Sequence, residues 1–579
     1  MSFMRSVVSG FLAFSLSGGI PAQIGGGTEC LPSACGQWNG PYVLNIPSSW
    51  EEITHAGVLP PRWGAPPTGF EGKVLFVAQP NPVCNLGSNP AYFTTTWLWD
   101  AANPTVARAV PVPNKDEHEL WCGCHAFSPD GDWLWIGGTN TTSLLMCFTG
   151  SRGVYRWDSA ASAWMAMNPL DGSGPRWYGT PLELASGAVL IDGDLAASFI
   201  LPAPPVSPRE THQVLTGMTL GPLLPNAKVN GTTCTPIGGN AELLGYAWMH
   251  QVKSGAAFRT GQEKDTKYFT MICPDLVNPG QFLSDRWVPA GANSNEHRFD
   301  GNSIHFLTFE VPPGSPPGTP PVRKETIFLV AGQSAISGNN GCTSATLNSI
   351  EKIVNPAPGV GWQTINPPVG FQMQFGRRHA NTVILPDGTL LVVGGLTWDT
   401  SLPIPSCQPA YSPELYDPFD GPDGKWFKMN AQLHRRGYHS VAFLLLDGRV
   451  VSAGGQMPVM PGTAEPEEHS VEIFSPPYLF NGPRPAISDA PASVNYLTSG
   501  GPSTFSFGVR AGIAGDGPAM VSLVRPSSVT HGVDFNQRFV QLFIESISIT
   551  SSPPPPTEYA VEVRKPEDAN ISLFRVSCG

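Results

Sequence analysis

The sequence predicts an all-β protein, a seven-bladed β-propeller followed by a C-terminal immunoglobulin-like β-sandwich, and three observations support this fold class. The 579 residues include 63 Gly and 61 Pro, which is typical of many tight turns. Hydrophobic residues still make up 41%, with 16 Trp and 29 Phe, so the chain can bury a core. A turn, a short apolar run and a Gly-Gly pair recur along the chain. These features describe short strands joined by turns, and they exclude a helical bundle or a coiled coil.

The charge balance argues against a nucleic-acid partner. There are 33 Lys and Arg residues against 45 Asp and Glu, which gives a formal net charge of −12 at pH 7. Because a protein that follows a phosphate backbone needs a basic surface, we expect no nucleic-acid partner. Beyond the N-terminus no stretch offers about twenty apolar residues, so the sequence predicts no transmembrane segment.

Residues 1–23 have the features of a signal peptide. Arg5 is the only charge before Glu29, residues 7–20 form a short apolar stretch, and residues 21–23 suit a cleavage site. A buried or disordered N-terminal strand is the alternative. The eleven cysteines are spread over the chain as in the disulfides of exported proteins. We therefore expect a secreted, periplasmic or cell-surface protein.

The repeat has the order of a turn with Gly, a β-rich apolar run, and Gly-Gly or its remnant. Asp-Gly before alternating apolar residues is a strong hairpin signal. The spacing of roughly 55–75 residues is somewhat longer than that of kelch repeats. Two β-sandwiches whose turns recur by chance are the alternative. Seven units predict seven four-stranded, kelch-type blades over residues 24–465, and they lie at 71–79, 130–138, 186–194, 254–262, 325–333, 387–395 and 447–455.

The sequence changes character near residue 465. From SPPYLFNGPRPAI (475–487) onward there is no further repeat unit, only strand-like stretches such as STFSFGV and RFVQLFI. Residues 466–579 are therefore predicted to form the immunoglobulin-like domain. The Pro-rich segments at 201–225, 311–322 and 552–556 are expected to be surface loops.

Four short segments place metal-ligating or redox-capable side chains next to repeat boundaries or in the C-terminal domain. They are HELWCGCH (118–125), RWYG (176–179), RRGYH (435–439) and VTH (529–531). Each has an ordinary interpretation when taken alone. Cys122 and Cys124 could pair in disulfides or hold zinc with His125. Tyr178 could be a core tyrosine, and Tyr438 and His439 could face opposite sides of a strand. His531 could lie on the surface.

Taken together, the repeats and these segments resemble the copper radical oxidases, galactose oxidase and glyoxal oxidase. The most specific matches are RGYHSVAFLLLDGRVVSAGG (436–455) and VTHGVDFNQR (529–538). RWYGT (176–180) and SPPYLFNGPRP (475–485) are closer to glyoxal oxidase and its bacterial relatives. The resemblance covers nearly the whole chain after residue 23.

The resemblance implies one copper ion, with His531 brought to it from the C-terminal domain on a hairpin through the propeller channel. The implied ligands are Tyr178, Tyr438, His439 and His531. It further implies that Cys122, with Cys124 as the rival, is joined to Tyr178 by a thioether bond. The linked Tyr178 would carry a radical that supplies the second electron, and Tyr438 would be the general base. Imidazole and phenolate ligands suit Cu(II).

The implied function is a secreted oxidase that converts an aldehyde of the glyoxal or methylglyoxal type, or a primary alcohol, with O2 and produces hydrogen peroxide. A carbohydrate partner also stays open. Galactose oxidase stacks a tryptophan on the linked tyrosine, but residues 191–199 contain none; Trp50 and Trp63 are the candidates. Candidate substrate arginines, each expected to be structural, are Arg176, Arg377 and Arg435. The alternatives are an inactive kelch propeller that binds glycans or a protein partner, and a disulfide-rich structural surface protein.

Overall fold

The computed structural model describes the larger part of the chain. The described residues are 9–15, 30–47, 50–61, 68–80, 95–113, 118–128, 131–140, 150–170, 176–192, 211–216, 219–220, 224–230, 233–236, 246–262, 264–270, 285–290, 294–312, 314–335, 342–403, 405–456, 469–491, 494, 503–511, 518–551, 557–567 and 575–576. Strands dominate, and the one α-helix in these ranges is α1 (Pro32–Cys35). None of the described helices is long and apolar enough to span a bilayer. The chain is thus all-β, as predicted.

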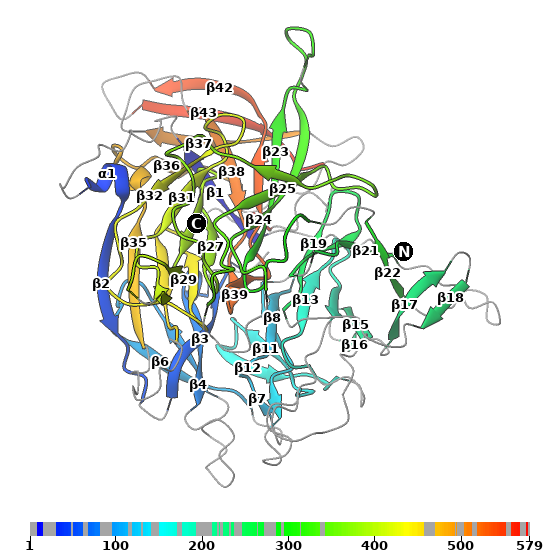
Figure 1. Cartoon of the computed structure of the whole chain (residues 1–579). Coiled ribbons are helices and arrows are strands. Elements are labelled where there is room, and N and C mark those ends of the chain that lie inside the picture. Colours follow the sequence, from blue (N-terminus) through cyan, green and yellow to red (C-terminus); the bar gives the residue numbers. More distant parts are fainter. Residues whose placement is uncertain are drawn as a thin grey trace.

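Seven groups of four strands repeat one antiparallel order, and their strands are labelled in Figure 1. Two of these groups are joined edge to edge into one ten-stranded sheet, and another continues into strands of the C-terminal domain. We call these groups blades and give the strands of each from the innermost outward. The first two blades are blade one, with β3 (Trp50–Val58), β4 (Val74–Pro80), β5 (Thr95–Trp99) and β6 (Ala107–Pro111), and blade two, with β8 (Cys124–Phe127), β9 (Trp133–Ile136), β11 (Val154–Asp158) and β12 (Ala163–Ala166).

The next two are blade three, with β13 (Thr180–Glu183), β14 (Val189–Asp192), β15 (Thr211–Thr216) and β17 (Leu224–Asn230), and blade four, with β19 (Trp248–Gln251), β20 (Ala257–Gly261), β21 (Lys267–Thr270) and β22 (Asp285–Pro289). Blade five has β23 (Asn302–Glu310), β24 (Val322–Val330), β25 (Ile350–Val354) and β26 (Gln363–Ile365).

The last two are blade six, with β27 (Asn381–Ile384), β28 (Leu390–Val393), β31 (Glu414–Asp417) and β32 (Lys425–Lys428), and blade seven, with β33 (Val441–Leu444), β34 (Val450–Ala453), β35 (Ser470–Ser475) and β2 (Gln37–Val43).

The propeller closes on itself at two levels. The first strands of blades two to seven contact one another in chain order, and β33 of blade seven then contacts β3 of blade one. The outermost strand of blade seven is β2, which pairs with β35 with Trp38 opposite Phe474. Since β35 extends to Ser475, the propeller sheet continues past residue 465, where the sequence placed the boundary.

The repeat units predicted from the sequence supply the second strand of every blade. In blade six the Asp387-Gly388 turn joins β27 to β28, and Asp387 Oδ1 accepts a hydrogen bond from the Thr389 N–H at 3.0 Å. Both strands are fully buried, so their apolar side chains form part of the largest core cluster. A local turn and a buried apolar run therefore fix each hairpin.

The C-terminal residues form a sandwich against one face of the propeller. One sheet has the order β36 (Ala486–Ser488), β37 (Thr504–Ala511), β43 (Thr557–Arg564), β42 (Ile544–Ser551), and it lies at the top of Figure 1. It packs through a separate core on β38 (Met520–Val524) and β41 (Phe539–Leu542). β1 (Ser9–Ser15) pairs with β38, so part of the predicted signal segment lies beside this sandwich; its cleavage stays a prediction.

A hairpin of the C-terminal domain enters the propeller. Its strands are β39 (Ser528–Thr530) and β40 (Val533–Asp534), and β39 pairs with β3 and contacts β8, so it lies between blades one and two. The two turn residues, His531 and Gly532, have φ values of 51° and 80°. Positive φ at both positions is the requirement of the tight type I′ hairpin. A Cβ on Gly532 would lie 2.6 Å from the Ala380 carbonyl, so the tip fits closely against blade six.

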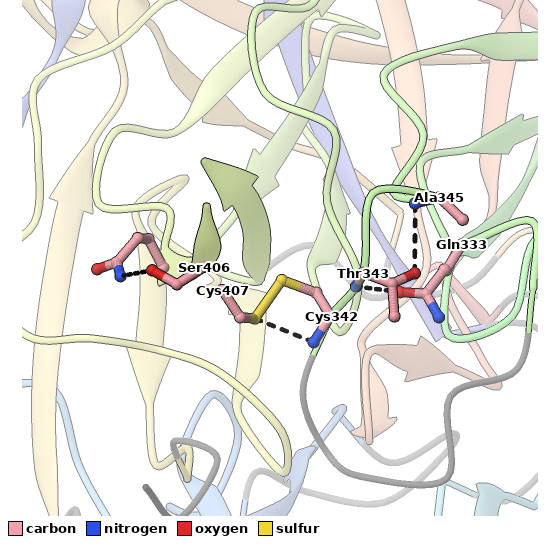
Figure 2. The surroundings of a disulfide bond; sticks show 7 residues. Gln333, Cys342, Thr343, Ala345, Ser406 and Cys407 are labelled. Atoms are coloured by element: carbon pink, nitrogen blue, oxygen red, sulfur yellow. Dashed lines mark hydrogen bonds between the residues drawn. A yellow bond between two sulfur atoms is a disulfide. The ribbon is translucent and has the colours of Figure 1, made fainter. Parts of the chain in front are cut away.

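Buried arginines hold the later blades together. Arg298, Arg377 and Arg436 each precede an innermost strand and are at most 1% exposed. Each donates to a glutamate on the third strand of its own blade and to a carbonyl at the end of the second strand. A disulfide between Cys342 and Cys407 also joins loops of blades five and six (Figure 2). The second described disulfide is Cys30–Cys35.

Candidate metal centre

Six blades each place one residue with a left-handed backbone at the same position, two residues before the innermost strand. These residues are Cys122 (φ 60°), Tyr178 (58°), Tyr246 (54°), Asp300 (54°), His379 (59°) and His439 (67°). Such a conformation costs on the order of 1–3 kcal/mol for a residue with a Cβ, and it tends to occur at functional sites. The repeated position therefore marks one end of the channel as the candidate site.

The four predicted metal ligands meet at this end of the channel. The hydroxyl oxygens of Tyr178 and Tyr438 lie 2.8 Å apart. The ring of His531 lies 5.0 Å from Tyr178, 5.3 Å from Tyr438 and 4.5 Å from His439, measured between ring centroids. Two blades and the C-terminal hairpin thus bring together side chains that are up to 353 residues apart in sequence.

Tyr438 and His439 are neighbours in sequence, yet both rings face the site. Their ring centroids are 3.8 Å apart, with planes inclined by 31°. A strand pair would send these side chains to opposite faces. Both residues instead lie before β33, and the left-handed backbone of His439 turns its ring to the same side as Tyr438.

Both imidazoles are oriented so that Nε2 points into the site. His439 Nδ1 donates to Glu52 Oε1 at 2.6 Å. His531 Nδ1 lies 2.6 Å from Thr530 Oγ1, whose hydroxyl donates to the Thr54 carbonyl, so His531 Nδ1 is the donor. The Nε2 atoms of both histidines are buried and have no hydrogen-bond partner among the described residues. Burial lowers the pKa of His531 well below its ordinary value, so its ring is neutral.

These observations fit a metal ion, because two orphaned imidazole nitrogens and two phenols converge. No group of three or more His, Cys, Asp and Glu side chains within the described ranges is placed to hold a metal; two of the four candidate donors are phenols instead. Burial raises the pKa of both Tyr178 and Tyr438 well above that of a free phenol. A cation would be needed to hold them as phenolates, and Cu(II) favours such nitrogen and oxygen ligands.

Cys122 lies directly against Tyr178. Its carbonyl accepts a hydrogen bond from the Tyr178 N–H at 2.9 Å, and its side chain packs in one cluster with the Tyr178 ring. The side chain is fully buried in a cluster with Trp121 and Trp177. The Cys122 side chain and the Tyr178 ring are therefore neighbours in the buried part of the candidate site.

Cys124 points elsewhere. Its thiol donates to the Ile136 carbonyl at 3.4 Å within the core of blade two, and burial raises its pKa to about 12. Neither Cys122 nor Cys124 forms a disulfide. The zinc alternative with His125 fails as well, because both ring nitrogens of His125 already have hydrogen-bond partners.

Three of the six residues with a left-handed backbone at this position were not identified from the sequence: Tyr246, Asp300 and His379. Tyr246 packs on the Tyr178 and His531 rings at 4.7 and 4.8 Å, and His379 packs on Tyr438 at 4.9 Å. Asp300 is 25% exposed, and its carboxylate accepts from Arg378 Nε at 2.7 Å. A sequence signal exists for two of them, because Asp300 and His379 follow an arginine by two positions, as Tyr178 does.

Two of the three candidate substrate arginines, Arg176 and Arg377, are buried and therefore structural, as expected. Arg377 is fully buried in its ion pair with Glu414, and Arg176 is fully buried; Arg435 is half-buried. The ring of Trp177 meets Tyr178 edge-on at 4.7 Å and 86°. The side chain of Trp50 and all of Trp63 lie outside the described residues.

Comparison with known proteins finds matches along most of the chain. Residues 330–478 match the family model "Glyoxal oxidase N-terminus", and residues 484–573 match "Galactose oxidase-like, Early set domain". A galactose oxidase from Gibberella zeae is 24% identical over 490 residues, covering 84% of this chain and 62% of that protein. The chain thus spans less than two thirds of the length of that relative.

Two further similarities extend over most of the chain. An aldehyde oxidase GLOX from Vitis pseudoreticulata is 24% identical over 448 residues, 75% of this chain and 74% of that protein. The fold is that of a fungal alcohol oxidase of the AA5 family solved in complex with copper, with a TM-score of 0.62, 18% identity and coverage of 94% of this chain and all of the other. The resemblance inferred from the motifs and the predicted fold class are both confirmed.

Proposed function

We propose that this chain, a relative of the galactose oxidases and glyoxal oxidases, is a secreted copper radical oxidase. Its substrate would be a small aldehyde of the glyoxal or methylglyoxal type, or a primary alcohol, and O2 would be reduced to hydrogen peroxide. The relatives support copper-dependent oxidation in general. The two disulfides support an oxidising compartment.

One observation carries the proposal: the Nε2 atoms of His439 and His531 are buried, lack partners among the described residues, and face two phenols that share a hydrogen bond. A buried polar atom without a partner is costly in a folded protein and calls for an explanation. Tyr178, Tyr438, His439 and His531 would hold the copper, and Cys122 would be linked to Tyr178. Copper and the linked tyrosine, when present, would each accept one of the two electrons that the oxidation removes.

The side chains themselves would orient the substrate and move its proton. Tyr178 and Tyr438 are half-buried, whereas His439 and His531 are 3% and 6% exposed, so substrate would approach on the phenol side. There the Tyr438 oxygen would take the proton of the substrate hydroxyl. An aldehyde would react as its hydrate, which provides such a hydroxyl. His379 and Tyr246 pack on the two phenols and limit their movement.

The test begins with the chain from about residue 24, loaded with copper in air. Peptide mass spectrometry should find Cys122 and Tyr178 in one linked product, two hydrogens lighter than its parts and resistant to reducing agents. One copper per chain and peroxide release with aldehydes or primary alcohols should accompany it, and His531→Ala should lose the copper. Recovery of Cys122 as an alkylatable thiol, without peroxide release, would refute the proposal and favour a glycan- or protein-binding propeller.

A further inference from the structure

A buried chain of hydrogen bonds joins Cys122 to the hairpin that carries His531. The Cys122 N–H donates to His55 Nε2 at 3.3 Å. His55 Nδ1 lies 3.1 Å from His125 Nε2, and His125 Nδ1 lies 2.6 Å from Ser528 Oγ. The Ser528 hydroxyl donates back to the His125 carbonyl at 3.1 Å. The chain of hydrogen bonds thus runs from blade two to His55 in blade one, back to His125 in blade two, and then into the C-terminal hairpin.

The direction of every hydrogen bond in this chain is determined by its ends. The Cys122 amide can only donate, so His55 Nε2 accepts and His55 Nδ1 carries the proton. His125 Nε2 must then accept, and His125 Nδ1 donates to Ser528. Burial lowers the pKa of both rings, that of His125 to about 3, in keeping with neutral imidazoles. The chain therefore has one arrangement of protons and no unsatisfied member.

The members of this chain are shielded from bulk solvent. His55, His125 and Ser528 are all 0% exposed. The rings of Trp133 and Trp135 pack on His125 at 5.0 and 4.8 Å, and Trp133 Nε1 donates to Ser528 Oγ at 2.8 Å. Removing one partner would leave a buried donor unsatisfied.

We propose that His55, His125 and Ser528 position Cys122 for its bond to Tyr178, and that this bond forms efficiently only when the C-terminal hairpin is docked. The inference rests on the proposed function. The Cys122 amide is held by the chain that ends on the hairpin, while its carbonyl is held by the Tyr178 N–H. Both ends of a residue with an unfavourable φ of 60° are thereby fixed beside the tyrosine.

The bond formation balances with dioxygen as the oxidant. A bond forms between Cys122 Sγ and a ring carbon of Tyr178, while the S–H bond and one ring C–H bond break. Two protons and two electrons pass to O2, which becomes hydrogen peroxide. Since thiol and ring must meet for this step, the rate depends on how often Cys122 occupies its docked geometry.

The test compares three variants of the full chain with a matched control. Ser528→Ala cuts the chain at its hairpin end, far from the thiol, and His55→Leu removes its centre. His55→Gln keeps an oxygen acceptor and a nitrogen donor, so it should restore part of the positioning of Cys122 that His55→Leu removes. The control is Ser452→Ala, which deletes a hydroxyl of a similarly buried serine in blade seven that donates to Gln432 at 3.0 Å.

Two readouts separate the inference from the proposed function. In the copper-free protein, hydrogen exchange of the Cys122 and His531 peptides should rise in Ser528→Ala and His55→Leu but not in Ser452→Ala. After addition of copper in air, linked peptide should accumulate roughly ten-fold more slowly in the first two variants, the effect of one unsatisfied buried donor. Wild-type rates of linkage in both would overturn the inference. Absence of linkage in the wild type would refute the proposed function. If hydrogen exchange of the Cys122 and His531 peptides is then also unchanged in Ser528→Ala and His55→Leu, the positioning role is overturned as well.

Discussion

Replacement of Glu52 by glutamine tests whether the candidate centre binds metal through His439. Glu52 Oε1 accepts from His439 Nδ1 at 2.6 Å, the short end of the range for a charged acceptor, and the two side chains are 2% and 3% exposed. The carboxylate fixes the proton on Nδ1, orients the ring and raises the basicity of Nε2. Glutamine retains an acceptor of the same shape but removes the charge.

The expected loss can be estimated from this contact. Removing an outer partner of a ligating histidine lowers metal affinity by about 10–100-fold, or about 1.4–2.7 kcal/mol. Because glutamine can still accept the hydrogen bond, we expect the lower part of that range, about ten-fold. The assay is titration of the copper-free protein with Cu(II) in competition with a chelator of known affinity, with urea unfolding measured in parallel.

Glu325→Gln is the matched control. Glu325 Oε1 lies 2.7 Å from His305 Nε2, and both side chains are 2% exposed, so this is a second buried His–Glu pair. It joins β23 and β24 of blade five and contributes no candidate ligand. The control should change stability or its pH dependence while leaving copper affinity unchanged. Wild-type affinity in Glu52→Gln, or an equal loss in both variants, would refute the assignment of His439 as a ligand.

Three further outcomes are expected. Tyr438→Phe removes the 2.8 Å hydrogen bond to Tyr178 and the proposed base, so it should keep bound copper but lose most of its peroxide production. Cys122→Ser should abolish the linked peptide in mass spectra, whereas Cys124→Ser should retain it. Burial raises the pKa of Glu325 from 4.5 to about 7, so between these values the folded chain holds a proton that the unfolded chain releases. Stability should therefore fall as the pH rises through this interval, by up to about 3 kcal/mol, and Glu325→Gln should remove that slope from urea unfolding curves.

The repeated hairpins could be predicted from the sequence because their determinants are local. The Asp387-Gly388 turn and the apolar run 390–393 lie within a dozen residues of the strand with which they pair. The strand that completes blade seven could not be predicted in this way. Residues 37–43 pair with residues 470–475, and no short-range pattern records a partner so distant in sequence.

The candidate site shows the same difference between residues with a local sequence signal and residues defined by distant partners. Tyr178, Tyr438 and His439 could be singled out as candidates because they lie in short motifs next to repeat units. Glu52 was missed, since its partner His439 is 387 positions away and a lone glutamate in a strand carries no signal. Tyr246 was missed as well, because its place is defined by position in the blade: it lies two residues before β19.

The repeated geometry also explains why a second domain is needed. Each of blades two to seven delivers one residue with a left-handed backbone to the channel end, and two adjacent blades supply Cys122 and Tyr178 in this way. Tyr438 and His439 come from blade seven, which contacts blade one across the closed ring. The fourth candidate ligand belongs to no blade: the type I′ turn of the C-terminal hairpin brings the His531 ring beside those of Tyr178, Tyr438 and His439. The same hairpin carries Ser528, so one docking event would both complete the ligand set and order the cysteine beside its tyrosine.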